Sequence, residues 1–296
     1  MPGRPVPKPE WLKVRLPGGE RYRRVKRAVE SGGLNTVCRE ARCPNVGECW
    51  DAGTATFMIL GDSCTRGCRF CSVRRANPGG ETDLDEPRRV ARAASEMGLD
   101  YAVVTSVTRD DLEDGGAAVF ADTIHSLRSL DPAPLVEVLI PDYLGEPLAT
   151  VIEAGPVVLA HNIEVVERLS GSMRHSRFSY RRSLEVLEEA RRLGGPRGML
   201  TKSSILLGLG ESRFEIVSAM RDLREAGVSL LVLGQYLRPT RSSAEVAEYV
   251  RPEVFDELTE AGREMGFDYV ASTPLARTSY RAAEAYVKRL RAARAG

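Results

Sequence analysis

The sequence has few histidines, little net charge and no long apolar run. Its 296 residues include three histidines, and the formal net charge is +1 at pH 7. A balanced charge gives no overall attraction to nucleic acids or anionic membranes, so we expect neither as a partner. No apolar stretch approaches the length of a membrane span, and residues 1–5 show no apolar signal-peptide core. These absences predict a globular protein in a reducing, cytoplasmic compartment.

Six cysteines are present, and they fall into two groups of three. Cys64, Cys68 and Cys71 lie in a short polar loop at the spacing C-x3-C-x2-C, with Phe70 before the last cysteine. Three thiolates can hold three corners of a cubane iron–sulfur cluster, which leaves the fourth iron open to a small molecule. The spacing resembles the signature of the radical S-adenosylmethionine (SAM) enzymes, in which the amino and carboxylate groups of SAM chelate that iron.

The second group is Cys38, Cys43 and Cys49, at the spacing C-x4-C-x5-C. Such wide, uneven gaps suit a loop wrapped around a large inorganic cluster, and Pro44 and Gly47 allow tight turns. This group also lacks a fourth cysteine. Any fourth ligand must therefore be oxygen, nitrogen or an exogenous molecule.

Two other interpretations of the cysteines stay open. Six cysteines could form three disulfides, but these would need an oxidising compartment. They could also bind zinc, although structural zinc prefers four ligands, and His125, His161 and His175 lie far from both groups in sequence.

The N-terminal segment is rich in proline and then in arginine. Five prolines within residues 1–19 predict an extended arm, and a basic helix is expected over 20–31. The basic residues are either a solvated helix face or a docking surface for an acidic partner or a nucleic acid.

From Thr54 onward, apolar runs of strand length alternate with segments of helical period. The predicted strands are 55–60, 101–106, 135–140, 157–160, 203–207 and 230–233, and a short apolar piece at 267–271 could add a last strand. The predicted helices are 86–97, 116–130, 147–154, 180–193, 213–226, 252–265 and 281–294. This alternation predicts a parallel sheet, and six units indicate an open, partial (β/α)6 barrel.

Functional groups of such barrels collect where the strands end. Thr105 and Ser106 end the second predicted strand, Asn162 and Glu164 follow the fourth, and Gln235 follows the sixth. We expect these side chains to converge with the Cys64 loop at one rim. The acidic segment 110–116 is expected to be a solvated loop or a lip that faces a cationic group of the substrate.

The chain resembles the lipoyl synthase family over roughly residues 30–285. The resemblance rests on both cysteine groups and on these stretches: 85–87, 103–112, 114–117, 161–162, 201–203, 208–211, 234–237 and Arg277-Thr278-Ser279-Tyr280. Two departures stand out, because Ala160 occupies a position where the family commonly has asparagine, and Thr278 replaces a serine. The cluster ligands are unaffected by either.

The resemblance implies a role for particular residues. Ser279 would be the fourth ligand of an auxiliary cluster on Cys38, Cys43 and Cys49, although its position would also suit an N-cap of the last helix. The catalytic set would be Ser279, Cys64, Cys68 and Cys71. The SAM contacts would be Phe70, Thr105, Ser106, Asn162, Glu164, Arg174 and Gln235.

The resemblance also implies the reaction. Two [4Fe–4S] clusters and SAM would serve sulfur insertion at C6 and C8 of an octanoyl chain on a carrier lysine, with the auxiliary cluster as sulfur donor. The carrier would be a dehydrogenase E2 subunit or the glycine-cleavage H protein, and ferredoxin or flavodoxin would supply electrons. Another sulfur-inserting radical SAM enzyme and a two-cluster electron carrier are the alternatives.

We predict that the chain is organised in three parts. Residues 1–53 would form the arm and auxiliary-cluster loop, 54–271 the barrel, and 272–296 the C-terminal segment.

Overall fold

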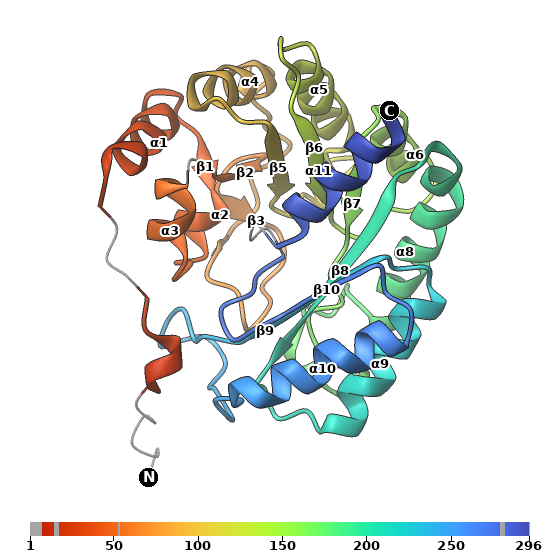
Figure 1. Cartoon of the computed structure of the whole chain (residues 1–296). Helices are drawn as coiled ribbons and strands as arrows, with labels where there is room; N and C mark the ends of the chain where they lie inside the picture. Colours follow the sequence, from red (N-terminus) through yellow and green to blue (C-terminus); the bar gives the residue numbers. More distant parts are fainter. Residues whose placement is uncertain (1–7, 15–17, 53, 279–281, 296) are drawn as a thin grey trace.

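The computed structural model describes residues 8–14, 18–52, 54–278 and 282–295. Its centre is an eight-stranded sheet in the order β1-β2-β5-β6-β7-β8-β9-β10 (Figure 1). The strands are β1 (Asn35–Thr36), β2 (Thr56–Ile59), β5 (Tyr101–Ser106), β6 (Leu135–Leu139), β7 (Val158–Ala160), β8 (Leu200–Leu207), β9 (Leu230–Gln235) and β10 (Tyr269–Ser272). A separate small sheet pairs β3 (Ser63–Cys64) with β4 (Arg74–Arg75).

The predicted partial barrel is confirmed. The seven strands from β2 to β10 in the large sheet pair in parallel, and β1 joins β2 antiparallel. β1 and β10 are the two ends of the strand order, so the pairing among the described residues does not close. The last strand, expected from the apolar piece 267–271, is β10.

Helices cover the outer face of the curved sheet (Figure 1). The barrel helices are α4 (Glu86–Met97), α5 (Ala117–Arg128), α6 (Glu146–Glu153), α8 (Tyr180–Gly194), α9 (Arg213–Glu225) and α10 (Pro252–Glu264). The N-terminal region adds η1 (Glu10–Leu12), α1 (Glu20–Ser31), α2 (Val37–Glu40) and α3 (Val46–Asp51). Of these α1 was predicted, whereas η1 interrupts the expected extended arm, and the expected loop of the second cysteine group contains α2 and α3. The short α7 (Glu167–Met173) and η2 (Gly195–Arg197) were not predicted either. No described helix has both the length and the apolar character that a bilayer span requires.

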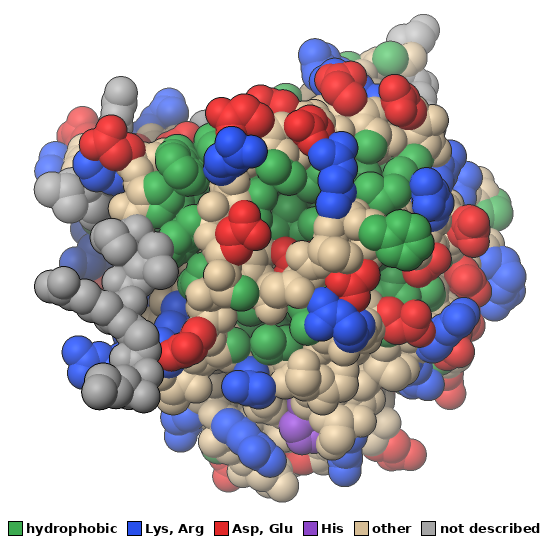
Figure 2. Space-filling view, turned by 90° about the horizontal axis from the view of Figure 1, so that it is seen from below, with side chains coloured by type: hydrophobic (Ala, Val, Ile, Leu, Met, Phe, Trp, Pro, Cys, Tyr) green, Lys and Arg blue, Asp and Glu red, His purple; other side chains and the backbone are tan. Residues whose placement is uncertain are grey.

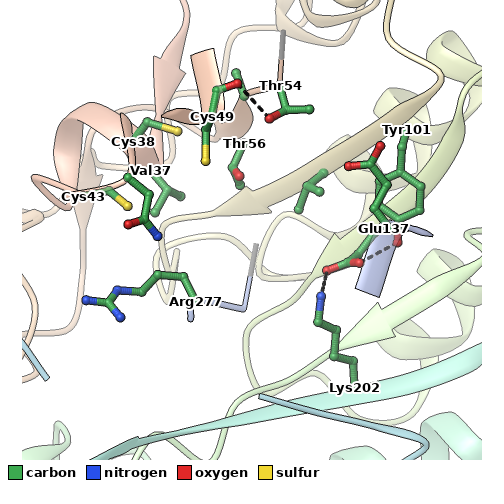
Figure 3. A pocket seen from close by; sticks show the side chains of 14 residues that line it. Val37, Cys38, Cys43, Cys49, Thr54, Thr56, Tyr101, Glu137, Lys202 and Arg277 are labelled. Carbon is green, nitrogen blue, oxygen red and sulfur yellow. Dashed lines mark hydrogen bonds and ion pairs between the residues drawn. The ribbon is translucent and has the colours of Figure 1, made fainter. Parts of the chain in front are cut away.

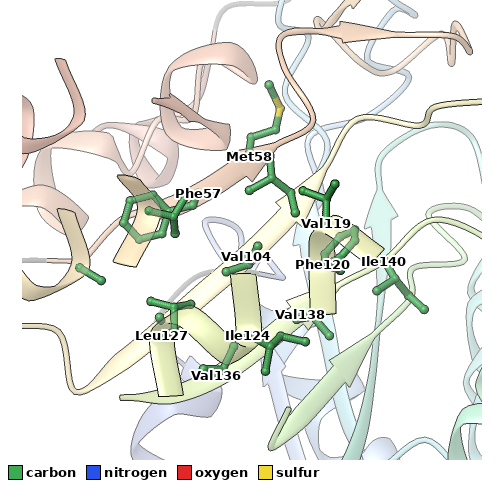
Figure 4. Close-up of a cluster of buried hydrophobic side chains, with 14 of the residues drawn as sticks. Phe57, Met58, Val104, Val119, Phe120, Ile124, Leu127, Val136, Val138 and Ile140 are labelled. Carbon is green, nitrogen blue, oxygen red and sulfur yellow. The ribbon is translucent and has the colours of Figure 1, made fainter. Parts of the chain in front are cut away.

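Apolar faces of the helices bury the outside of the sheet. Phe120, Ile124 and Leu127 recur at helical spacing on α5 and belong to the same fully buried cluster as Val104 and Val138 of the strands beneath (Figure 4). Burying each such side chain contributes about 1.5–3 kcal/mol. This packing fixes the strands, and the strand ends carry the site.

The terminal helix α11 (Ala282–Ala295) lies at the opposite end of the barrel from the Cys64 loop. Its Val287 is 1% exposed and packs with Tyr101, Val158 and Leu230, the first residues of β5, β7 and β9. The N-terminal end of the strands is thereby covered. On the face seen from below, acidic and basic side chains are interspersed, as the small net charge suggests (Figure 2).

Candidate functional site

A cavity of about 190 Å³ lies at the C-terminal ends of β5, β6 and β7. Cys64, Cys68 and Cys71 all line it. Six of the seven predicted SAM contacts line it too: Phe70, Thr105, Ser106, Asn162, Glu164 and Arg174. These residues come from segments more than a hundred positions apart in the chain. We call this space the SAM cavity.

An arginine inside the cysteine loop fastens that loop to the barrel. Arg66 forms ion pairs with Asp110 at 2.7 Å and with Asp142 at 2.8 Å, and its guanidinium lies 4.2 Å from the ring centre of Phe178. The Thr65 N–H also donates to the Thr108 carbonyl. The sequence analysis missed Arg66, although its position between two cysteines was a usable signal.

The acidic segment after β5 has a different role from the predicted solvated loop or substrate lip. Asp110 accepts from Arg66, and that hydrogen bond is the largest influence lowering the pKa of Asp110. Asp111 pairs with the buried Arg109 at 2.8 Å, and Asp114 accepts from the Gly116 and Ala118 N–H groups at the start of α5. The cations that this segment faces are therefore arginines of the chain itself.

Two buried polar atoms point to a bound molecule in the SAM cavity. The Ser106 hydroxyl and Arg174 Nε have no hydrogen-bond partner among the described residues. Arg174 is 7% exposed, so its side chain is buried at the wall of the cavity and is not a surface arginine. Unpaired buried polar groups cost about 1–3 kcal/mol each, so a ligand with a carboxylate and hydroxyls would satisfy them.

Asn162 and Glu164 form a rigid polar pair beside Arg174. The Asn162 amide donates to Glu164 Oε1 at 3.0 Å, and Glu164 holds a left-handed backbone with φ of 65°. A left-handed backbone costs a non-glycine residue a small amount of conformational free energy. Such residues are often found at functional sites. Burial raises the pKa of Glu164, while Asn162 and Arg174 oppose that rise.

His161, which lines the SAM cavity, is held neutral. Its two ring nitrogens contact the Ile140 carbonyl at 3.0 Å and Ser183 Oγ at 2.9 Å. Burial, followed by the charge of Arg174, lowers the pKa of His161 to about 4. His161 was not among the predicted site residues, although it directly precedes the predicted SAM contact Asn162.

Gln235 does not lie among the residues that line the SAM cavity. Its amide nitrogen donates to the carbonyls of Leu207, Tyr236 and Glu248, and its oxygen accepts from the Val250 N–H. With these backbone partners the side chain ties the end of β9 to the following loop. The predicted SAM contact of Gln235 has no support in this geometry.

The second cysteine group lines a smaller cavity of about 40 Å³, which we call the auxiliary cavity (Figure 3). Cys38, Cys43 and Cys49 lie on one side, and Arg277 enters from the C-terminal segment. Burial raises the pKa of Cys38 and of Cys43, while the Asn45 N–H and Arg277 lower that of Cys43. Bound cations deprotonate such thiols, so this donor set fits a metal cluster.

A buried ion pair forms the far wall of the auxiliary cavity. Lys202 Nζ lies 2.7 Å from Glu137 Oε1, and the Tyr101 hydroxyl donates to Glu137 Oε2 at 2.6 Å (Figure 3). The side chains of Lys202 and Glu137 are 2% and 1% exposed. The sequence analysis did not predict this network, because nothing in a strand pattern shows that two charged residues face each other.

The two cavities are neighbours along the same inner face of the barrel. On β5, Val103 lines the auxiliary cavity and Thr105 the SAM cavity, and on β6 Glu137 and Leu139 divide in the same way. Residues two apart in a strand point to the same side and lie about 7 Å apart. The two cavities therefore lie one above the other along β5 and β6, offset by two residues of each strand.

The alternative interpretations of the cysteines can now be judged. None of the six cysteines forms a disulfide, so the disulfide interpretation is wrong. Within the described ranges, no group of three His, Cys, Asp or Glu side chains could hold one metal ion. A cluster differs from zinc in that each thiolate binds a different iron atom, so wider spacing suits it. Ser279, the predicted fourth auxiliary ligand, lies outside the described residues.

Comparisons with known proteins agree with this geometry. The family model of the radical SAM superfamily matches residues 58–223. Among solved structures, methylornithine synthase PylB aligns with a TM-score of 0.53 and 14% sequence identity, and the alignment covers 79% of this chain and 80% of PylB. The hydrogenase maturase HydG from Carboxydothermus hydrogenoformans aligns with a TM-score of 0.56 and 15% sequence identity, and that alignment covers 78% of this chain and 65% of HydG. The chain is therefore a radical SAM protein, with the fold of that superfamily.

The N-terminal region and the curated relatives narrow this class. A model of the N-terminal domain of lipoyl synthase matches residues 4–43. The chain is 54% identical to lipoyl synthase of Anaeromyxobacter dehalogenans over 95% of both chains. It is 51% identical to that of Methanocella arvoryzae over 97% of both chains. The chain belongs to the lipoyl synthase family.

Membership defines the activity and the cofactors. The protein is an enzyme that inserts sulfur by radical SAM chemistry to form lipoyl groups, and its cofactors are two [4Fe–4S] clusters and SAM. It acts on a protein that carries an octanoyl group, and it requires a reductant.

Proposed function

We propose that the two cavities divide the reaction between them. Cys64, Cys68 and Cys71 would hold the SAM-binding cluster, and Cys38, Cys43, Cys49 and Ser279 the auxiliary cluster. The observation that carries this proposal is the stacking of the two cavities on one face of β5 and β6. When bound, the SAM-site cluster and SAM supply a 5′-deoxyadenosyl radical and the auxiliary cluster supplies sulfur.

The residues of the SAM cavity would orient the cofactor and keep water away. Arg174 Nε would pair with the SAM carboxylate, which gives that buried atom its missing partner. Asn162 and Glu164 would bind ribose hydroxyls. The buried Ser106 hydroxyl would form a hydrogen bond with another polar atom of SAM. Phe70 and Thr105 complete the wall, and Thr105 Oγ1 is fixed by the Leu139 carbonyl at 2.8 Å.

Ser279 would differ chemically from the three cysteines proposed to bind the same cluster. An alkoxide is a harder ligand than a thiolate, and its high intrinsic pKa makes it easy to lose by protonation. Serine would therefore be the ligand that the cluster loses most easily. Cys38, Cys43 and Cys49 would keep the remaining corners in place.

The finer assignments are part of the same proposal. The octanoylated carrier would be a dehydrogenase E2 subunit or the glycine-cleavage H protein, and ferredoxin or flavodoxin would reduce the enzyme. The absence of disulfides among the six cysteines favours a reducing setting, which we take to be the cytoplasm. The division into an auxiliary-cluster segment 1–53, a barrel 54–271 and a C-terminal segment 272–296 also belongs to the proposal.

The test uses the cluster-loaded enzyme with SAM, dithionite and an octanoyl-lysine peptide under anaerobic conditions. We expect the peptide to gain two sulfur atoms, and we expect Cys43→Ala and Ser279→Ala to abolish that gain while 5′-deoxyadenosine still forms. Ser95→Ala is the matched control, because Ser95 is an exposed residue of α4 outside both cavities. Sulfur insertion that survives Ser279→Ala would refute the ligand assignment. Absence of 5′-deoxyadenosine from a protein with two intact clusters would refute the division of roles.

A further inference from the structure

The C-terminal segment before Ser279 contacts both cavities. Asn45, which lies between two auxiliary cysteines, donates from Nδ2 to the Leu275 carbonyl at 2.7 Å. Arg277 lines the auxiliary cavity. Thr278, the next residue, instead bonds to Asn162 of the SAM cavity. Four consecutive residues thus reach from one cavity to the other.

The contact between Thr278 and Asn162 is reciprocal. Asn162 Nδ2 donates to Thr278 Oγ1 at 3.0 Å, and the Thr278 hydroxyl donates to Asn162 Oδ1 at 3.3 Å. Both residues are buried, with 9% of Thr278 and 8% of Asn162 exposed. Hydrogen bonds in such a shielded place compete little with water, so this pair holds the segment firmly.

The backbone of the same segment is fixed by β9. The Gln235 N–H donates to the Pro274 carbonyl at 3.2 Å, and a Cβ at Gly234 would lie 2.1 Å from the Ala276 carbonyl oxygen. Gly234 therefore permits an approach that any side chain would block. Arg277 and Thr278 are the last described residues before Ser279, and the side chain of Thr278 anchors this end of the segment to Asn162.

We propose that Thr278 is a positioning residue that couples the auxiliary site to the SAM cavity through Asn162. This inference rests on the proposed role of Ser279 as the fourth auxiliary ligand. Among the described residues Asn162 Oδ1 accepts from the Thr278 hydroxyl alone, which leaves the second lone pair of that oxygen open, while both N–H groups of Asn162 donate to Glu164 and Thr278. A ribose hydroxyl that donates to that lone pair immobilises Asn162 further, and Thr278 with it. Binding of SAM thereby secures the segment that carries the serine.

The test measures iron loss from the auxiliary cluster of the full-length, cluster-loaded enzyme to a colorimetric chelator, with and without SAM. The contribution of the other cluster is obtained from Cys43→Ala proteins, which retain the Cys64 site alone. For the unaltered enzyme we expect SAM to slow auxiliary iron loss about fivefold. Thr278→Val removes the hydroxyl and keeps the shape, so we expect about tenfold faster loss from the missing hydrogen bonds and no effect of SAM.

Two further variants separate positioning from general destabilisation. Thr278→Ser retains the hydroxyl and is expected to restore both the slow rate and the SAM effect. Thr273→Val makes the same change at an exposed residue of the same segment and is expected to behave like the unaltered enzyme. A Thr278→Val protein with an unaltered rate, or with the full SAM effect, would overturn the proposal.

Failure of the proposed function gives a different result. If the Ser279→Ala protein loses auxiliary iron at the rate of the unaltered enzyme, Ser279 is not a cluster ligand. That result refutes both the ligand assignment and the coupling through Thr278. If Ser279→Ala matches Thr278→Val while Thr278→Ser recovers, the coupling holds whatever peptide the enzyme accepts. The iron measurement does not depend on sulfur insertion, so the two failures are distinguishable.

Discussion

The two cavities hold the same number of cysteines but are built in different ways. The SAM cavity is formed at strand ends, where polar groups such as Asn162 and Arg174 converge. The auxiliary cavity is formed from strand interiors, closed by the N-terminal helices α2 and α3, which carry Cys38 and Cys49, and by Arg277 of the C-terminal segment. In the proposed division of roles, the first would bind the exchangeable cofactor SAM and the second would enclose the auxiliary cluster.

The difference shows how a barrel can serve two purposes. Loops after parallel strands can vary without disturbing the sheet, so a ligand site there needs few compensations. A site inside the strands must satisfy every charge it buries, as Lys202, Glu137 and Tyr101 do. Each of the following changes tests one side of this contrast.

The largest expected effect comes from removing one cysteine from each group. Cys68→Ala should abolish 5′-deoxyadenosine formation, because two thiolates cannot retain the SAM-site cluster. Cys43→Ala should leave 5′-deoxyadenosine formation in place and abolish sulfur transfer. Iron content and 5′-deoxyadenosine yield, measured on both proteins, check the division. Identical losses in the two variants would mean that the cavities do not act separately.

The next effect concerns the wall of the auxiliary cavity. Lys202→Met should lower the free energy of unfolding by about 3–5 kcal/mol, because Glu137 is left as an unpaired buried charge. Urea unfolding of the cluster-free chain measures this. Arg263→Ala breaks the exposed Arg263–Glu260 pair and should cost less than about 1 kcal/mol. Lys202→Met combined with Glu137→Leu should recover part of the loss, and an equally unstable double variant would contradict the buried-charge explanation.

The matching effect in the SAM cavity depends on pH. The pKa of His161 is lowered from 6.5 to about 4, so the unfolded chain binds a proton there before the folded chain does. The stability due to neutral His161 is therefore complete above pH 6.5 and lost as the pH falls toward 4, up to about 3 kcal/mol in all. Unfolding of the cluster-free chain from pH 7 to 4 measures it. His161→Gln should flatten this dependence, and an unchanged slope would exclude His161 as its source.

The smallest effect separates the arginines of the two cavities. Arg277 lowers the pKa of Cys43, so Arg277→Met should raise that pKa and slow alkylation of Cys43 at pH 8 by a few-fold in the cluster-free chain. Arg174→Met should slow alkylation of Cys68 instead, since Arg174 lowers the pKa of Cys68. Mass spectrometry of the alkylated peptides resolves the individual cysteines. Equal slowing at both cysteines in either variant would argue against separate electrostatic environments.

The sequence by itself determined the alternating strands and helices and both cysteine groups. It also indicated which polar residues at strand ends meet in the SAM cavity, because parallel strands bring residues at their ends to one rim whatever their separation in the chain. Thr105, Ser106, Asn162 and Glu164 could be placed by that rule alone. The short helix α7 was not predicted, because seven residues show too little helical periodicity to be recognised in the sequence.

The tertiary structure decided what each polar side chain contacts. Gln235 and Glu164 both lie near strand ends, yet only Glu164 lines the SAM cavity, whereas Gln235 bonds to the backbone around it. The pairing of Lys202 with Glu137, and of Thr278 with Asn162, joins residues 65 and 116 positions apart. Local sequence patterns carry period and propensity but not partners, because a partner is fixed only when the sheet has folded and the C-terminal segment lies across it.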